Sequence, residues 1–151
     1  MNVELADEAA TLRLAGQLAA ALPDDRRGMV VLLEGELGTG KSTLARGLIR
    51  ALGHAGSVPS PTYTLVEPYE LPGGPVYHVD LYRIASADEL TFLGFDELDD
   101  GLALIEWPER AGGLDAAADL RIELRYAGRG RSARLAPLSP KGQALLAALP
   151  K

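Results

Sequence analysis

The sequence predicts an α/β fold in which helices flank a mostly parallel sheet and an antiparallel hairpin lies at one side. Short apolar runs at residues 29–33 and 102–106 have the length and composition of strands buried on both faces. Segments with helical spacing alternate with such runs, which is typical of parallel sheets with crossover helices. Residues 120–126 and 133–138 flank the turn-forming sequence AGRGR and predict the hairpin.

Length and composition indicate one globular domain over residues 1–151. Hydrophobic residues make up 47 % of the chain and charged residues 24 %, which excludes disorder over most of its length. The sequence has no cysteine, so zinc fingers, iron–sulfur clusters and thiol catalysis are excluded. A net charge of −6 argues against a general nucleic-acid binder. The uncharged runs are too short to span a membrane and the N-terminus is acidic, so we expect a soluble, cytoplasmic protein without a membrane partner.

The first three elements are expected to be a helix, a strand and a second helix. Asp7 can cap the first helix, and apolar residues recur with helical spacing as far as Leu22. The strand at residues 29–33 follows a polar loop. A glycine-rich turn joins this strand to a helix over residues 42–52, which Gly53 can end.

The middle of the chain predicts two strands and a short helix. Residues 62–69 are rich in β-forming side chains, and residues 70–75 form a turn that leads into a strand at 76–80. Ser86 and Glu89 have the spacing of a capping box, which would open a short helix.

The last third predicts a loop, a strand, the hairpin and a final helix. The acidic run 96–100 is expected to be a solvated loop, and residues 102–106 follow it as a strand. Ser139 and the proline after it start a helix that ends near Leu149. Five arginines make the hairpin basic: Arg121, Arg125, Arg129, Arg131 and Arg134. Their side chains are expected either to be solvated or to contact a nucleotide, tRNA or a protein partner.

The turn after the first strand carries a phosphate-binding motif. The sequence GELGTGKS at residues 35–42 fits the pattern G-x-x-x-x-G-K-[ST] without a mismatch, and it joins a buried strand to a helix as that motif requires. Its glycines let successive backbone N–H groups face inward, and the helix N-terminus favours an anion. Lys41 supplies an ammonium group for the β- and γ-phosphates, and the Ser42 hydroxyl is a ligand for Mg²⁺. The sequence therefore predicts a P-loop NTPase.

Two carboxylates are candidates for the metal and for the attacking water. Asp80 and Glu106 each end a predicted strand, and ligands in open α/β sheets lie at the carboxyl ends of the strands. A P-loop site needs an acidic residue at such a position. The residues alone leave open which carboxylate contacts Mg²⁺ and which one orients water.

Several kinds of P-loop protein remain to be distinguished. No lysine is followed two residues later by aspartate, so the segment that reads guanine in GTPases is missing. A small-molecule kinase is one alternative, with residues 81–98 as its lid and Arg83 as a phosphate clamp. A module that binds ATP without hydrolysing it is another.

Four blocks of the sequence together resemble the bacterial TsaE family. They are GELGTGKSTLARG at residues 35–47, SPTYTLV at 60–66, HVDLYR at 78–83 and IEWPER at 105–110, and the resemblance extends over residues 5–148. It implies an ATPase that is needed for making threonylcarbamoyl-adenosine beside the tRNA anticodon. It also implies that the chain acts with the TsaB–TsaD heterodimer, reaches tRNA only through that complex, and does not itself transfer the carbamoyl group.

The resemblance also assigns roles to single residues. It makes Lys41 the phosphate lysine, Ser42 and Glu106 the Mg²⁺ ligands, and Asp80 the acid that supports the attacking water. Catalytic residues are thus Lys41, Asp80 and Glu106. The ATP-binding residues that it implies are Thr11, Gly38, Thr39, Gly40, Lys41, Ser42, Thr43, Gly130 and Arg131. From the residues alone, a capping or solvated role stays open for Thr11, Gly130 and Arg131.

Other residues keep alternative interpretations. Thr62 and Thr64 resemble a switch that senses the γ-phosphate, although both are also ordinary strand formers. Trp107 is expected either near the nucleotide or a partner, or in the core. His54 and His78 have no second ligand at metal-binding spacing, so neither is expected to form a zinc site.

Overall fold

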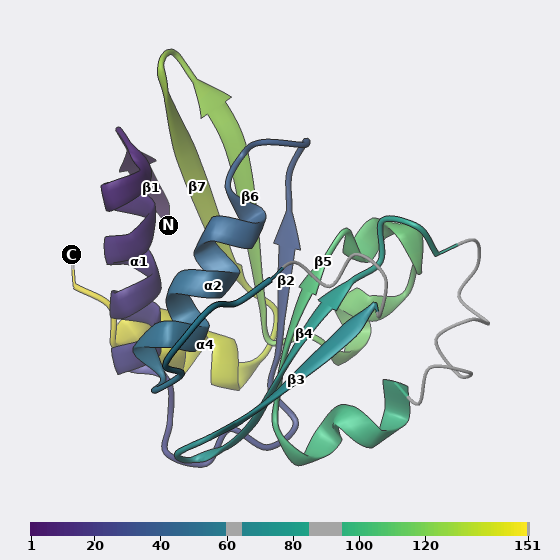
Figure 1. The fold of residues 1–151 in the computed structure, drawn as a ribbon. Helices are drawn as coiled ribbons and strands as arrows, with labels where there is room; N and C mark the ends of the chain where they lie inside the picture. The colour runs from purple at the N-terminus through teal and green to yellow at the C-terminus, as the bar shows by residue number, and fades with distance from the viewer. Residues whose placement is uncertain (60–64, 85–94, 151) are drawn as a thin grey trace.

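The computed structural model describes residues 1–59, 65–84 and 95–150, and their centre is a mixed sheet (Figure 1). Within these residues the sheet has seven strands in the order β1-β7-β6-β2-β5-β4-β3. The strands are β1 (Asn2–Leu5), β2 (Val30–Glu34), β3 (Val66–Leu71), β4 (Gly74–Asp80), β5 (Leu102–Glu106), β6 (Leu120–Ala127) and β7 (Gly130–Pro137). The helices are α1 (Glu8–Ala21), α2 (Lys41–Ala51) and α4 (Pro140–Ala147), with 3₁₀ turns η1 (Phe95–Asp100), η2 (Pro108–Arg110) and η3 (Leu114–Ala117).

The central strands are parallel, which confirms the predicted fold class. Strand β2 pairs in parallel with both β5 and β6, and β5 pairs in parallel with β4. Antiparallel strands lie at both sides of the sheet. At one side β7 pairs antiparallel with both β6 and β1, and at the other side β3 and β4 form a hairpin. Because β2, β4 and β5 are parallel, their carboxyl ends lie at the same end of the sheet, which is where α/β proteins bind their ligands.

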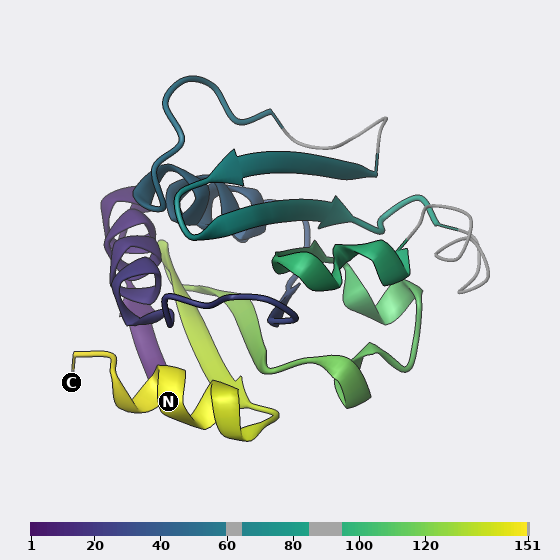
Figure 2. The ribbon, with the colours of Figure 1, turned by 90° about the horizontal axis from the view of Figure 1, so that it is seen from below.

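Two hydrophobic clusters cover the two faces of the sheet. Val31 and Leu33 of β2 pack in the cluster that includes α1, α2 and α4, whereas Leu32 packs in the cluster on the opposite face. The second cluster contains residues around η2 and η3, such as Ala111 and Ala118. Figure 2 shows α1 and α2 on one side of the molecule and the 3₁₀ turns away from them. The buried character predicted for β2 follows from this double coverage.

Helix capping occurs where the sequence predicts it. The Asp7 carboxylate accepts a hydrogen bond from Ala10 N at 2.9 Å, and α1 starts at the next residue. Ser139 Oγ accepts from Gly142 N at 3.1 Å and donates to the buried Asp119 carboxylate at 2.7 Å. Asp119 also accepts from Val30 N at 2.9 Å, so it joins the start of β2 to the start of α4.

The substitution Gly142→Ala should destabilise the protein. A Cβ at position 142 would lie 1.7 Å from the Asp119 carbonyl oxygen, so α4 would have to move away from the sheet. We expect a loss of roughly 1–3 kcal/mol in the free energy of unfolding, measured by urea denaturation. Gly16→Ala is the matched control, because a Cβ there meets nothing within 4 Å in the interior of α1 and should stabilise by roughly 0.5–1 kcal/mol. Equal unfolding free energies for the two variants would contradict the packing described.

Two local expectations are wrong. The acidic run at residues 96–100 belongs to the 3₁₀ turn η1 rather than to a loop, although Glu97, Asp99 and Asp100 are exposed as expected. The turn expected over residues 70–75 is shorter, because β3 continues to Leu71 and β4 starts at Gly74. Both differences arise from tertiary contacts that local composition does not encode.

One strand and the 3₁₀ turns η2 and η3 were not predicted, and other predicted features lie outside the described residues. Strand β1 is four residues long and pairs along β7, with Leu5 opposite Arg131. The capping box of Ser86 and Glu89 and the residues Thr62 and Thr64 fall in the ranges that are not described. In the part of the chain that is described, no helix has the length and apolarity needed to cross a membrane.

Candidate functional site

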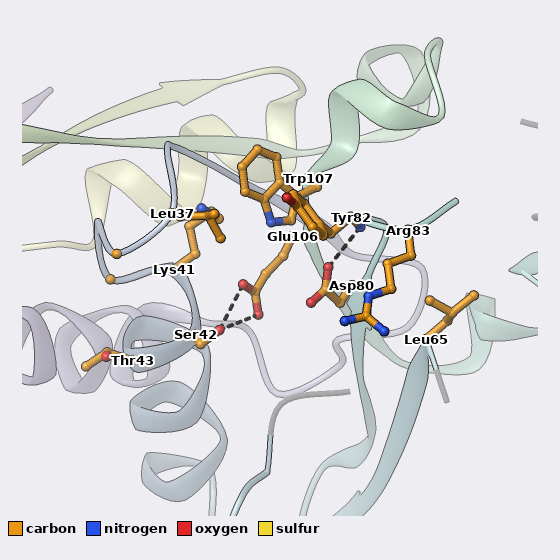
Figure 3. A pocket seen from close by; sticks show the side chains of 12 residues that line it. Leu37, Lys41, Ser42, Thr43, Leu65, Asp80, Tyr82, Arg83, Glu106 and Trp107 are labelled. Atoms are coloured by element: carbon orange, nitrogen blue, oxygen red, sulfur yellow. Dashed lines mark hydrogen bonds between the residues drawn. The ribbon is translucent and has the colours of Figure 1, made fainter. Parts of the chain in front are cut away.

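The predicted P-loop and both predicted carboxylates line one cavity of about 420 Å³ (Figure 3). Asp80 ends β4 and Glu106 ends β5, and the two are register partners in the parallel ladder. Lys41 and Ser42 open α2 on the other side of the cavity. The structure thus brings together the P-loop residues Gly38, Gly40, Lys41, Ser42 and Thr43 with Asp80 and Glu106.

Glycines determine the path of the loop between β2 and α2. Gly38 and Gly40 have positive φ angles of 82° and 106°, a region that disfavours residues with a Cβ. Gly40 occupies the N-cap position of α2, and no side chain caps this helix. The first backbone N–H groups of α2 are therefore free of a side-chain partner and form a site suited to a phosphate group.

Lys41 is held inside the loop that it follows. Its Nζ donates to the carbonyl oxygens of Gly35 at 2.5 Å and Glu36 at 2.9 Å, and it lies 4.2 Å from the centroid of the Trp107 ring. Burial lowers the pKa of Lys41, while the nearby carboxylates, Glu106 foremost, oppose that shift. An ammonium group has three N–H donors, so two carbonyl contacts leave one for a further acceptor.

Ser42 and Glu106 form the pair best suited to a divalent cation. Ser42 Oγ lies 3.0 and 3.1 Å from the two carboxylate oxygens of Glu106, a side chain that is almost completely buried. A hydroxyl and a carboxylate are hard oxygen donors of the kind that Mg²⁺ selects. Residues 1–59, 65–84 and 95–150 contain no group of three or more His, Cys, Asp or Glu side chains that could hold a metal. Two protein ligands suit Mg²⁺, which takes its remaining oxygens from water and phosphate.

Asp80 has a different environment from Glu106. Its Oδ1 accepts a hydrogen bond from Tyr82 N at 2.9 Å, and its carboxylate borders the cavity (Figure 3). Burial raises the pKa of Asp80, and the charge of Glu106 raises it further, although the Tyr82 N–H opposes both effects. Asp80 is therefore a half-buried carboxylate with an oxygen available to the cavity.

Residues remote in sequence surround the other side of the P-loop. A second cavity of about 290 Å³ is lined by Thr11 of α1, by Gly38, Thr39, Gly40 and Thr43, and by Gly130 and Arg131 of β7. The Arg131 guanidinium donates to Gly38 O, with nitrogen–oxygen distances of 3.2 and 3.3 Å. Thr11, Gly130 and Arg131 were implied only by the family resemblance, and the fold places all three beside the P-loop.

Tyr126 is a P-loop contact that sequence reasoning missed. Its hydroxyl donates to Leu37 O at 2.5 Å, and its ring lies 4.4 Å from the Arg131 guanidinium. Together the two side chains bond to consecutive carbonyls at the apex of the loop. The alternation of apolar and polar residues in β6 gives no sign of this contact. The contact depends on the position of the β6–β7 hairpin relative to a loop that is 89 residues away in the sequence.

Tyr126→Phe should weaken nucleotide binding without affecting the fold. Without the hydrogen bond to Leu37 O, the loop apex is less ordered in the free protein. Nucleotide binding would then have to order the apex, at a cost of about 0.5–1 kcal/mol, which raises Kd about two- to fivefold. Tyr77→Phe is the matched control, since that hydroxyl donates to Asp100 at 2.6 Å away from the cavity. Calorimetric titration with ADP measures both. Identical affinities for the two variants would show that Tyr126 does not support the loop.

Trp107 lies at the cavity and only partly in the core. Its backbone has a φ of 59°, which is unusual for a residue with a side chain and is found often at functional sites. Its ring lies 4.9 Å from that of Tyr82, and it packs in part against the second hydrophobic cluster. The ring therefore contacts both the P-loop lysine and the second hydrophobic cluster, and a role beside a nucleotide or partner stays a prediction.

His78 is a second residue that sequence reasoning passed over. It is completely buried in β4, and its Nε2 lies 2.5 Å from Oε2 of Glu106. Strand alternation places His78 on the same face as Asp80, two residues later, but the sequence gives no sign of its contact with Glu106 on the neighbouring strand.

Comparisons with known proteins agree on one family. A family model described as "Threonylcarbamoyl adenosine biosynthesis protein TsaE" matches residues 5–134. A protein of Haemophilus influenzae named tRNA threonylcarbamoyladenosine biosynthesis protein TsaE is 38 % identical over 146 residues, which cover 94 % of this chain and 92 % of the relative. A protein of the same name from Synechocystis is 40 % identical over 116 residues, or 73 % and 71 % of the two chains. The crystal structure of Bacillus subtilis YdiB superposes with a TM-score of 0.76 at 26 % identity and covers 97 % of this chain and 91 % of that one.

Proposed function

Since the chain belongs to the TsaE family of tRNA threonylcarbamoyladenosine biosynthesis proteins, we propose that it serves this modification as a Mg²⁺-dependent ATPase. The observation that carries the proposal is the convergence of a P-loop lysine, a hydroxyl–carboxylate pair and a second carboxylate on one cavity. Lys41, Asp80 and Glu106 are the catalytic residues in this proposal. This set contains the parts that P-loop hydrolases use.

Each residue has a distinct task in hydrolysis. The backbone N–H groups at the start of α2 and Lys41 Nζ bind the phosphates. Ser42 and Glu106 would hold Mg²⁺, which when bound neutralises charge on the phosphate oxygens. Asp80 accepts a hydrogen bond from the attacking water and orients it toward the γ-phosphorus, because its carboxylate borders the cavity. Thr11, Gly130 and Arg131 border the adjoining cavity, and we assign them to the rest of the nucleotide.

The fate of the γ-phosphate tests this proposal. ATP labelled at that position, incubated with Mg²⁺, the protein and its partners, should yield labelled inorganic phosphate, and chelation of Mg²⁺ should stop the release. Label found in an organic acceptor would indicate a small-molecule kinase, for which Arg83 at the cavity is a possible clamp. Intact ATP in the presence of the partners would indicate a non-hydrolysing module.

We further propose the TsaB–TsaD heterodimer as the partner, with tRNA reached only through that complex. A net charge of −6 disfavours direct tRNA binding, because the phosphate backbone repels an acidic protein. If nucleotide and partner binding are coupled by about 1–3 kcal/mol, a non-hydrolysable ATP analogue should tighten binding to TsaB–TsaD by about 5- to 150-fold. Surface plasmon resonance with and without the analogue measures this. Unchanged affinity, or tight binding of tRNA by the chain alone, would refute the proposed partnership.

A further inference from the structure

His78, Glu106 and Ser42 form a chain of contacts that runs from strand β4 to the P-loop helix. His78 lies two residues before the end of β4 and Glu106 at the end of β5, on the face of the sheet that packs against α2. His78 Nε2 lies 2.5 Å from Glu106 Oε2, and Ser42 Oγ lies 3.0 Å from Oε1 and 3.1 Å from Oε2 of the same carboxylate. The carboxylate thus has two partners, the buried His78 ring at Oε2 and the P-loop hydroxyl at both oxygens.

The burial of this chain makes the histidine contact significant. The His78 side chain is completely buried, and the Glu106 side chain is 3 % exposed. A carboxylate removed from water in this way needs hydrogen bonds, because its desolvation is otherwise costly. Among the described residues, His78 and Ser42 are the side chains that contact it by hydrogen bonds.

The hydrogen-bond pattern also fixes where the ring carries its proton. His78 Nδ1 is buried and has no partner among the described groups. With the proton on Nε2, the ring donates to Glu106 and leaves Nδ1 as an acceptor. The opposite tautomer would place two acceptors 2.5 Å apart and bury an N–H without a partner, so it is disfavoured.

We propose that His78 is a positioning residue that holds Glu106 for Mg²⁺. By donating to Oε2, the ring fixes the carboxylate where Ser42 Oγ reaches both of its oxygens. It leaves Oε1, which His78 does not contact, for the cation that Ser42 and Glu106 would share. When a buried partner holds one oxygen of a metal-binding carboxylate, the side chain loses less conformational entropy as the metal binds to the other oxygen. The inference rests on the proposed function, because it assigns His78 to the Mg²⁺ arm of that site. It extends that function by one residue, which touches neither nucleotide nor metal.

Three substitutions at position 78 separate positioning from space filling. Glutamine can place its amide nitrogen near the Nε2 position and donate to Glu106, asparagine reaches only the Nδ1 position, and leucine fills the space without a donor. We expect the Mg²⁺ concentration for half-maximal binding of a non-hydrolysable ATP analogue to rise at least fivefold in His78→Leu and His78→Asn. In His78→Gln it should stay within about twofold of the wild type. Affinity for the analogue in the presence of EDTA should be unchanged, because the P-loop itself is intact.

The outcomes distinguish this inference from the proposed function. If analogue binding by the wild type depends on Mg²⁺, and His78→Leu needs the same Mg²⁺ concentration for half-maximal binding, the positioning role is refuted while the proposed function stands. A glutamine variant as impaired as the leucine variant would also refute it, since a merely structural histidine would show no rescue. If the wild type shows no Mg²⁺ dependence, both fail.

A measurement on the unmodified protein removes any dependence on folding of the variants. The chain has two histidines, so the variant His54→Gln assigns the nitrogen NMR signals of the imidazole rings. The His54 ring lies away from the site, where it contacts Ser57 O and the Tyr69 ring. The His78 ring should be protonated at Nε2 and unprotonated at Nδ1. A proton on Nδ1 with a bare Nε2 would contradict the proposal.

Discussion

Replacing Lys41 with alanine should reduce ATP turnover by about a hundredfold or more. The Lys41 ammonium is buried beside the loop carbonyls, where a charge-assisted bond to the γ-phosphate in the transition state is strong. Removal of one preorganised donor to a developing negative charge typically costs about 10²–10³ in rate. Phosphate release at saturating ATP and Mg²⁺ measures the effect.

The matched control for this prediction is Lys141→Ala. Lys141 is exposed in α4, and its loss changes the net charge by the same amount without touching the cavity. Turnover in that variant should equal that of the wild type. Because Lys41 is buried, the melting temperature of both variants must be recorded, and the Lys41→Ala protein should remain folded. Near wild-type hydrolysis by a folded Lys41→Ala protein would overturn the P-loop assignment.

The second large effect separates the two carboxylates. Asp80→Asn should reduce turnover by about 10²–10⁴ while leaving nucleotide affinity within a few-fold, because the amide is a weaker acceptor for the attacking water. Glu106→Gln should instead raise the Mg²⁺ concentration needed for nucleotide binding, because Ser42 and the cation lose their shared carboxylate. Parallel titrations of Mg²⁺ and ATP with both variants give the comparison. The reverse pattern would exchange the roles of Asp80 and Glu106.

The local parts of the site could be predicted from the sequence. The P-loop is a contiguous motif whose glycine, lysine and serine positions have a fixed geometry, so residues 35–42 indicated it directly. Asp80 and Glu106 could be predicted from pattern alone, since parallel strands end at one edge and both carboxylates follow buried runs. Thr11, Gly130 and Arg131 came from resemblance, and the fold supplies the reason for their proximity.

The tertiary contacts could not be predicted in this way. His78 and Glu106 are 28 residues apart, and their contact depends on two strands being neighbours in a particular register. Tyr126 contacts the loop apex across a gap of 89 residues. Strand β1 is too short to show a pattern, and it exists because β7 offers it an open edge.

Formation of threonylcarbamoyl-adenosine in a reconstituted system tests whether ATP hydrolysis at this site serves the tRNA modification. The assay contains TsaB, TsaD, threonylcarbamoyl-adenylate, tRNA, Mg²⁺ and this chain, and it measures modified tRNA with ATP or with a non-hydrolysable analogue. ATP with the wild-type chain should increase the amount of modified tRNA, whereas the analogue with the wild-type chain, or ATP with Lys41→Ala, should not. Equal modification with ATP, with the analogue and with Lys41→Ala would contradict the claim that hydrolysis at this site serves the tRNA modification.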